Sequence, residues 1–572
     1  MCKYKKLNRH PLAQETIMAS KRDIFAALFS DIDTNSVIIA SAVVKYTIYS
    51  YIYGNKNHMK MKTRNIIAAM LLVSTAMSAQ SVKVQIHEDS QNLKVIPKEI
   101  YGQFSEHLGS CIYGGLWVGP ESEIPNIDGY RADVFNALKE LKVPVMRWPG
   151  GCFADDYHWR DGIGPKEDRP RMVNSNWGGT VEDNSFGTHE FLNLCELLGC
   201  EPYISGNVGS GSVEEMAKWV EYMTAPDGPM AKLRTENGRK EPWKVKYFGI
   251  GNEAWGCGGN MRPEYYSHVY RRYATYCRNF GDNRLYKIGS GASDYDYDWT
   301  KVLMEMIGNQ MDGVSLHYYT VKGWNGSKGS ATQFDADEYY NTIGKAMGIE
   351  PVIKRHMAIM DTYDPERKID LLVDEWGTWF DVEPGTNPGH LFQQNTMRDA
   401  MVAALSLNIF HKYTERVKMT NIAQVANVLQ SMVLTKGDKM VLTPTYHVFR
   451  MYNVHQDAQF IPFECDSEIR KDALGRPYPV IDATASRNAA GEINVVLVNT
   501  DLEKDSEVVL DFDSMGKAEI SGEILTSGKI QDYNDFDSPE KVCPKTFKDF
   551  KSKDGKVTVK LPAKSIVSLK FN

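Results

Sequence analysis

The sequence lacks the features that mark several common classes of protein. Its 66 Lys and Arg residues are outnumbered by 73 Asp and Glu residues, the net charge is −7, and no basic block interrupts the folded part. Because phosphate binding needs a basic face, we exclude nucleic acid as a partner. The nine cysteines include no Cys-x-x-Cys pair and no zinc-ligand spacing. The sequence therefore predicts no metal, and it does not say whether any cysteines pair.

The N-terminal segment carries the one targeting signal. Within residues 59–79, three basic side chains precede a short apolar run, and small residues follow. This order is typical of a secretory signal peptide, and the run is too short to span a bilayer. We predict that residues 1–58 are an upstream extension, that 59–79 are the signal, and that the protein is exported to the periplasm or beyond without stable membrane insertion. A membrane anchor over residues 36–53 is the alternative, which Lys45 in its middle disfavours.

The main body of the chain repeats one pattern, a short apolar run followed by an amphipathic stretch. Helix-period positions such as Val134, Leu138 and Leu141 separate the runs, and Gly199 supplies a helix stop. Eight units of this size predict an α/β fold, a (β/α)₈ TIM barrel. The eight predicted strands are residues 100–104, 143–147, 202–206, 245–250, 286–290, 313–317, 369–374 and 417–422.

The pattern changes after about residue 435, where short β runs alternate with turns and no helical pattern is seen. This predicts an all-β sandwich, jelly-roll-like domain at the C-terminus. The β-like segment at 82–87 precedes the barrel and is expected to join the sandwich. The predicted domains are residues 80–98 for N-terminal strands, 99–432 for the catalytic barrel and 433–572 for the sandwich. The predicted sandwich strands are 493–498, 508–512, 520–525, 557–561 and 566–571.

Two acidic residues stand where predicted strands four and seven end. Glu253 follows strand four through Asn252, and Glu375 follows strand seven. Active sites of such barrels lie at the C-terminal ends of the strands. Strands four and seven face each other, so we expect these carboxylates to approach the ~5–5.5 Å separation of a retaining glycoside hydrolase. Two unrelated loop carboxylates are the alternative reading.

Other strand ends supply further polar groups: Glu106, Arg147, His317, Tyr319 and Gln424. Each alone is more often structural than functional, but all five are expected on one rim. Glu106 is suited to accepting hydrogen bonds from sugar hydroxyls. Arg147 can orient a neighbouring carboxylate and keep it ionised.

At these residues the sequence resembles the α-L-arabinofuranosidases of glycoside hydrolase family 51. The resemblance runs from about residue 82 to the C-terminus. It is carried by the stretches IYGQFSEHLGSCIYGGLWVG, VMRWPGGCFADDYHWRDGIGP, YFGIGNEAWGCGGNM, GVSLHYYT, LLVDEWGTWF and NIAQVANVLQ. The sequence departs from some members at Cys152 and Gly377, where those members have Asn. A thiol is a weak hydrogen-bonding group, so a sugar contact by that first Asn is not carried over.

The resemblance implies specific roles for the residues at the strand ends. Glu253 matches the acid/base and Glu375 the nucleophile of the family, and no cofactor is implied. The positions matching those that hold the furanose or orient the catalytic pair are Glu106, Arg147, Asn252, His317, Tyr319 and Gln424, and Trp379 matches an aromatic bordering the sugar.

The expected activity is retaining, exo-acting removal of terminal α-L-arabinofuranosyl units from arabinan, arabinoxylan or arabino-oligosaccharides. The expected partner is thus an arabinose-containing plant glycan, and relatives of this kind are commonly homo-oligomers. A backbone-cleaving glucanase or xylanase of the same barrel class is the second hypothesis. A catalytically silent carbohydrate-binding protein is the third, which the two intact carboxylates disfavour.

Overall fold

The computed structural model describes residues 81–516 and 518–572. The predicted extension, the signal peptide and the alternative anchor at 36–53 all lie outside these residues. Within the described ranges, no helix is both long enough and apolar enough to cross a membrane.

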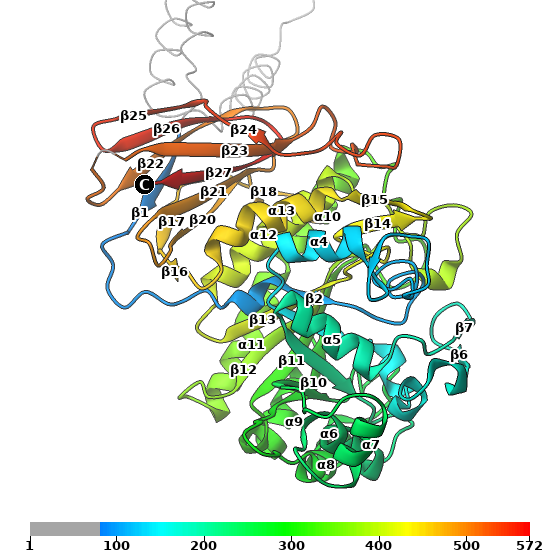
Figure 1. Cartoon of the computed structure of the whole chain (residues 1–572). Coiled ribbons are helices and arrows are strands. Elements are labelled where there is room, and N and C mark those ends of the chain that lie inside the picture. The colour runs from blue at the N-terminus through cyan, green and yellow to red at the C-terminus, as the bar shows by residue number, and fades with distance from the viewer. Residues whose placement is uncertain (1–80, 517) are drawn as a thin grey trace, which may run out of the picture. The chain divides into compact units, whose positions relative to one another are not determined.

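Eight parallel strands close into a barrel, which confirms the predicted fold class (Figure 1). Each predicted strand overlaps one barrel strand. In chain order these are β2 (Gly102–Phe104), β5 (Val145–Trp148), β8 (Glu201–Gly206), β9 (Tyr247–Ile250), β10 (Tyr286–Ser293), β11 (Gly313–Thr320), β12 (Asp370–Thr378) and β13 (Val417–Ala423). Because all eight strands run the same way, their C-terminal ends share one face of the barrel.

Helices follow each barrel strand. They are α4 (Ala132–Glu140), α5 (Thr188–Leu198), α6 (Val213–Thr224), α7 (Pro229–Glu236), α8 (Pro263–Tyr276), α9 (Tyr297–Ile307), α10 (Ala336–Met347), α11 (Ile349–Tyr363), α12 (Met397–Lys412) and α13 (Pro444–Tyr452). Local sequence sets their ends. For example, Ser212 accepts a hydrogen bond from the Glu215 backbone N–H at the start of α6, and Gly199 ends α5 in the left-handed conformation.

Helix α13 corrects the expectation that no helix follows residue 435. It comes after the last barrel strand and packs in the same hydrophobic cluster as the barrel, so it serves as the eighth barrel helix. The predicted boundary at residue 432 therefore falls between the eighth strand and the eighth helix. A local signal was present, because Thr443 caps the helix and Pro444 occupies its first turn.

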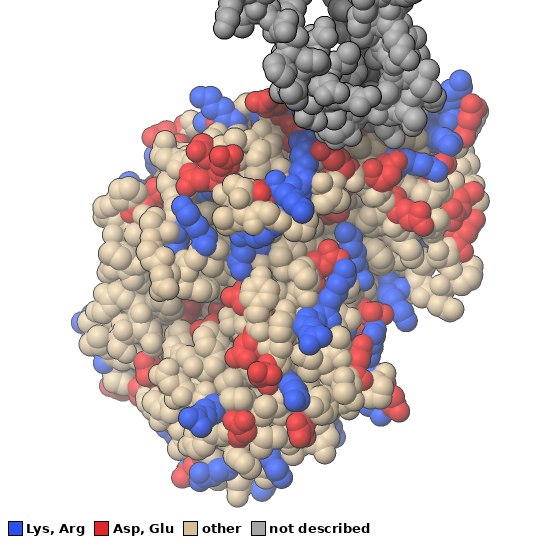
Figure 2. Space-filling model, turned by 180° about the vertical axis from the view of Figure 1, so that it is seen from behind, with Lys and Arg blue, Asp and Glu red and all other residues tan. Residues whose placement is uncertain are grey.

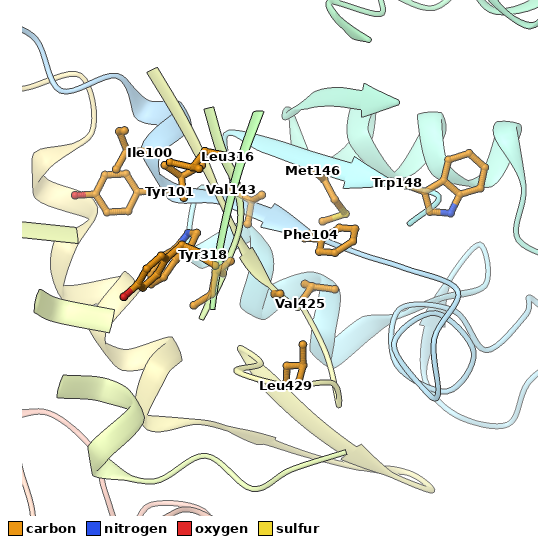
Figure 3. Packing of buried hydrophobic residues seen from close by; sticks show 14 of the residues in the cluster. Ile100, Tyr101, Phe104, Val143, Met146, Trp148, Leu316, Tyr318, Val425 and Leu429 are labelled. Atoms are coloured by element: carbon orange, nitrogen blue, oxygen red, sulfur yellow. The ribbon is translucent and has the colours of Figure 1, made fainter. Parts of the chain in front are cut away.

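Six buried side chains, each from a different barrel strand, form a small cluster of their own: Val145, Tyr203, Tyr247, Ile288, Leu372 and Met419. One large cluster of buried apolar side chains joins the barrel to its helices. Figure 3 shows part of this cluster, with Phe104 from β2, Met146 from β5 and Val425 just beyond β13. Small hairpins decorate the loops: β3 (Asn126–Ile127) with β4 (Tyr130–Arg131), β6 (Met172–Asn174) with β7 (Thr180–Glu182), and β14 (Val433–Lys436) with β15 (Lys439–Leu442). The packed interior fixes the strand ends that carry the polar groups.

The C-terminal part is a two-sheet sandwich with its own apolar core. One sheet has the order β17-β1-β22-β26-β25 and the other β16-β20-β21-β27-β23-β24. The strands are β1 (Val82–Ile86), β16 (Gln459–Phe460), β17 (Phe463–Cys465), β20 (Ile481–Arg487), β21 (Ile493–Asn499), β22 (Ser506–Phe512), β23 (Ile520–Thr526), β24 (Lys545–Thr546), β25 (Phe550–Lys553), β26 (Lys556–Leu561) and β27 (Ser565–Phe571), with a separate hairpin of β18 (Ile469–Lys471) and β19 (Pro477–Pro479). Strand β1 pairs in parallel with β22, so residues before the barrel belong to this sheet.

Helix α12 connects the barrel to the sandwich. Every side chain from residue 397 to residue 411 is buried, which marks a helix enclosed on all sides. It contacts α13 and β12 of the barrel and β20, β21 and β27 of the sandwich. On its sandwich side, Asn408 donates a 2.9 Å hydrogen bond to Asp482, and His411 bonds Thr484 at 2.9 Å. In Figure 1 the helix lies beside the orange and red strands.

The face of the protein drawn in Figure 2 has no large patch of only acidic or only basic side chains. There, acidic and basic side chains are interspersed between uncharged ones.

Candidate active site

The barrel fold brings Glu253 and Glu375 together at its C-terminal face. Glu253 lies just after β9, and Glu375 lies within β12 near its end. A carboxylate oxygen of each lies within 4.8 Å of the other, and a ring nitrogen of His317 lies 2.8 Å from Glu253 and 3.5 Å from Glu375. Both glutamates line a cavity of about 310 Å³. The two carboxylates expected at one rim therefore lie close together.

Glu375 is held by donors on both oxygens. Arg147 Nη1 donates to Oε1 at 2.8 Å, and the Tyr319 hydroxyl donates to Oε2 at 2.8 Å. His317 Nδ1 lies 3.5 Å from Oε2. These partners hold the Glu375 carboxylate in one position.

Arg147 is a buried hub that reaches several strand ends. Burial opposes its charge, but Asp374 and Glu375 raise its pKa above the usual range. Its Nη2 donates to Asn252 Oδ1 at 2.6 Å, and its Nε donates to Ser205 Oγ at 3.1 Å. Because a guanidinium presents its donors in a rigid fork, Arg147 sets the relative positions of Asn252 and Glu375.

Glu253 has an environment that differs from that of Glu375. Burial raises its pKa, and a hydrogen bond from His317 Nδ1 at 2.8 Å partly opposes that rise. Its backbone has a φ of 39°, in the left-handed region that non-glycine residues rarely adopt. Such strain persists only where the surroundings impose it, and it is common at functional sites. A carboxyl group whose pKa is raised is suited to donating a proton near neutral pH.

His317 links the two glutamates to the buried Asp374. Its Nδ1 faces Glu253, and its Nε2 lies 3.3 Å from Asp374 Oδ1. Burial opposes protonation, but Glu375, Asp374 and Glu253 together raise the pKa of His317 to about 10. The ring is therefore an imidazolium with a donor on each side. His317 also pairs with Glu375 in the register between β11 and β12, which places the ring beside that carboxylate.

Glu106 accepts four hydrogen bonds. Oε1 receives the backbone N–H groups of Gly151 and Phe153 at 3.0 and 3.1 Å and the indole N–H of Trp177 at 2.9 Å. Oε2 receives the Gln424 amide at 2.9 Å. Burial and the nearby Glu375 raise the pKa of Glu106 to about 7. Glu106 thus anchors the loop after β5 as well as lining the cavity.

Two glycines allow the loop after β5 to pass close to the side chains of Glu106 and Glu375. A Cβ atom on Gly150 would lie 2.6 Å from Glu106 Cγ, and one on Gly151 would lie 2.7 Å from Glu375 Oε1. Contacts below 3.0 Å force a shift of the neighbouring atoms. The two glycines of the Pro-Gly-Gly sequence therefore leave room for the side chains of Glu106 and Glu375.

These contacts predict separable effects for two neighbouring substitutions. Glu106→Ala should lower the free energy of unfolding by about 2 kcal/mol, because buried donors of Gly151 and Phe153 lose their acceptor, and should also lower kcat/KM. Gln424→Ala leaves those backbone donors paired, so we expect a loss of kcat/KM with little loss of stability. Thermal unfolding and steady-state kinetics on the same preparations test this. Equal thermal shifts for the two variants would contradict the anchoring role of Glu106.

The predicted residues divide into those that line the cavity and those that lie behind it. Glu106, Glu253, Tyr319, Glu375, Trp379 and Gln424 line it. Arg147, Asn252 and His317 do not: Arg147 bonds Glu375, His317 bonds Glu253, and Asn252 bonds Arg147.

The sequence analysis did not identify most of the tryptophans that line the cavity. Trp177, Trp255 and Trp324 line the cavity together with the predicted Trp379. The rings of Trp324 and Trp379 meet edge to face at a centroid distance of 5.3 Å. Aromatic faces of this kind pack against the apolar faces of sugar rings. Trp255 stands two residues after Glu253. That proximity was the only local indication that any of these three tryptophans lies at the site.

Sequence reasoning also left the cysteines unpaired. Cys152 and Cys257 form a disulfide beside Glu253, with Cα atoms 5.5 Å apart and a sequence separation of 105. Cys152 follows Gly151 and lines the cavity.

Two carboxylates this close, at the ends of strands four and seven of a (β/α)₈ barrel, are the arrangement that glycoside hydrolysis needs. Residues 137–339 match the family description "Alpha-L-arabinofuranosidase 1 domain", and residues 374–565 match "Alpha-L-arabinofuranosidase C-terminal domain". A Bacteroides ovatus protein named "Intracellular exo-alpha-L-arabinofuranosidase" is 63% identical over 514 residues, covering 89% of this chain and 100% of that protein. The chain belongs to the α-L-arabinofuranosidases of glycoside hydrolase family 51.

Solved structures agree with this assignment. The family 51 arabinofuranosidase of Xanthomonas axonopodis pv. citri superposes with a TM-score of 0.84 at 48% identity, covering 86% of this chain and all of the other. The Thermotoga maritima α-L-arabinofuranosidase, solved as an arabinose complex, gives a TM-score of 0.76 at 28% identity, covering 86% and 99%.

The comparison corrects one prediction. The Bacteroides ovatus relative is named intracellular, which contradicts the export predicted from residues 59–79. The predicted signal rested on a short apolar run after basic residues, and such a composition is not confined to signal peptides. The prediction of a periplasmic or extracellular protein is therefore wrong.

Proposed function

We propose that the chain releases terminal non-reducing α-L-arabinofuranosyl units from arabinose-containing glycans with net retention of configuration. One observation carries this proposal: oxygens of Glu253 and Glu375 lie within 4.8 Å of each other. Retaining enzymes have carboxyl groups about 5–5.5 Å apart, whereas inverting enzymes need about 6.5–9.5 Å to admit a water molecule between the general base and the sugar. The close pair therefore favours direct attack by one carboxylate on the sugar.

The contacts support a role for each glutamate in this proposal. Glu375, fixed by Arg147 and Tyr319, attacks the anomeric carbon. Glu253, whose pKa burial raises, gives its proton to the departing oxygen. A covalent arabinosyl ester on Glu375 results, and Glu253 is left as a carboxylate. It then removes a proton from water, which attacks the same carbon and frees arabinose and Glu375.

The surrounding residues support these two steps. The His317 imidazolium holds the Glu253 side chain in place, and Asn252 takes its position from Arg147. Glu106 and Gln424 present an acceptor and an amide to the sugar hydroxyls, and Trp379 borders the furanose. These roles for the lining residues follow from the family resemblance together with their places in the cavity.

The size of the cavity supports exo action. At about 310 Å³ it lies at the small end of ligand sites, which suits one terminal sugar better than a long backbone. The name of the Bacteroides ovatus relative supports action inside the cell, where short arabino-oligosaccharides would be the substrates. Aryl α-L-arabinofuranoside should be hydrolysed far faster than aryl β-xyloside or β-glucoside. Faster hydrolysis of either β-glycoside would favour a backbone-cleaving enzyme.

The stereochemical course tests the mechanism itself. Two successive inversions at one carbon predict that the arabinose first released is the α anomer. Proton NMR during the first minutes of hydrolysis, before mutarotation, separates the anomers. First-formed β-arabinose would identify an inverting enzyme and would remove Glu375 from the nucleophile role.

A further inference from the structure

The sulfur atoms of Cys152 and Cys257 lie against the carboxyl group proposed as the acid/base. Cys152 Sγ is 3.8 Å from Glu253 Oε2, and Cys257 Sγ is 3.6 Å from the same oxygen. In the disulfide neither sulfur carries a proton, so these are contacts and not hydrogen bonds. Cys152 comes from the loop after β5 and Cys257 from the loop after β9, so two separate loops bring three reactive side chains to one point.

Reduction changes the chemistry of this point. A phosphine reductant gives two electrons to the disulfide, the S–S bond breaks, and each sulfur gains a proton. The phosphine becomes its oxide, taking oxygen from water, so atoms and electrons balance. The product is a pair of thiols next to a carboxylate, and deprotonated thiols are strong ligands for soft and borderline metal ions.

The three side chains lie close enough together to share one ion once the S–S bond is broken. One ligand atom from each of Cys152, Glu253 and Cys257 can be chosen so that all three lie within 4.8 Å of one another. Two sulfurs and one oxygen suit Zn²⁺, which takes thiolates at about 2.3 Å and carboxylates at about 2.0–2.2 Å. Cys257 is exposed, so an ion can reach the site from solvent.

We propose that the reduced Cys152–Cys257 pair and Glu253 form a binding site for one thiophilic divalent cation, with Zn²⁺ as the matching ion, and that the disulfide closes this site. Three protein ligands leave a fourth tetrahedral position for water. Zinc bound there engages the carboxyl group that must carry the proton, so the cation inhibits hydrolysis. That consequence rests on the proposed function, whereas the binding itself does not.

The competing location is the catalytic site proper. Glu253, His317 and Glu375 also offer ligand atoms within 4.8 Å of one another. A cation held there would bind whether or not the cysteines are joined. Dependence on the redox state therefore separates the two locations.

The test uses the full chain in two states, oxidised and reduced with a phosphine that is then removed under argon. Equilibrium dialysis against Zn²⁺ measures the ion bound per chain. We expect one equivalent more in the reduced state than in the oxidised state, and loss of that equivalent in Cys152→Ser and in Cys257→Ser. Cys543→Ser, which removes a half-buried free cysteine of the sandwich, is the matched control and should keep it.

Hydrolysis of an aryl α-L-arabinofuranoside gives the second readout. One equivalent of Zn²⁺ should lower the rate of the reduced enzyme at least tenfold, a chelator should restore it, and the oxidised enzyme should be insensitive. Equal zinc binding in both redox states of the wild-type chain would overturn the proposal, even if the cysteine variants failed to fold. If the chain bound zinc as expected but hydrolysed no arabinofuranoside, the proposed function would fail and the metal site would stand.

Discussion

Glu375→Ala is expected to abolish turnover on every arabinofuranoside, with kcat falling by about 10⁴-fold or more, as for the loss of other enzymatic nucleophiles. The reason is that attack on the anomeric carbon is needed whatever group departs. A good leaving group such as nitrophenol should therefore not rescue this variant. Arg147 keeps its partners Asn252 and Asp374, so the fold should persist. Initial rates on nitrophenyl and oligosaccharide substrates, with circular dichroism for folding, test this.

Added azide sharpens this experiment. In the space left by the missing carboxylate, azide can attack the nitrophenyl arabinoside directly, which is a single inversion. The expected product is the β-arabinofuranosyl azide. An α-arabinofuranosyl azide from Glu375→Ala would mean that the covalent intermediate still forms, and Glu375 would then not be the nucleophile.

Glu253→Ala should separate the two halves of the reaction. On arabino-oligosaccharides, whose leaving group needs a proton, kcat/KM should fall by about 1,000-fold, within the usual range for loss of general acid catalysis. On a nitrophenyl substrate the first step needs no acid, so the arabinosyl ester should form and then stall without a base to activate water. Stopped-flow absorbance should show a burst of nitrophenol followed by slow release.

Azide gives this variant the opposite stereochemical outcome. It should speed the slow phase, because it attacks without base help, and two inversions should then give the α-arabinofuranosyl azide. Glu383→Ala is a suitable control, since Glu383 lies beyond the end of β12 and outside the cavity lining. It should keep wild-type kinetics. Absence of a burst in Glu253→Ala would place the acid elsewhere.

The fold could be predicted because its signals are local. Each barrel strand is a short apolar run, and each run ends at the polar residue that reaches the rim, so strand order alone placed Glu253 and Glu375 on one face. Thr443 and Pro444 mark the start of helix α13. The helix was not predicted, because the β runs that follow it indicated an all-β region after residue 435. The composition of residues 59–79 predicted export. The name of the Bacteroides ovatus relative contradicts that prediction.

The remaining parts of the site depend on the paths of loops. Trp177 lies between the two strands of the β6–β7 hairpin, and Trp324 lies in the loop after β11. Neither sequence position indicates which way its loop turns. The Cys152–Cys257 pair joins two loops that are far apart in the chain, and pairing over such a distance leaves no local pattern. The four donors to Glu106 likewise come from three separate segments.

The complete enclosure of α12 means that the sandwich is not an interchangeable accessory. A chain cut after the barrel would present the apolar outer face of this helix to water, and an exposed apolar surface of that kind promotes association between chains. The sandwich could be exchanged for another β domain only if the replacement carried a matching surface, including partners for Asn408 and His411. The two folds must therefore change together in evolution, so family 51 barrels with this helix should occur with a sandwich attached.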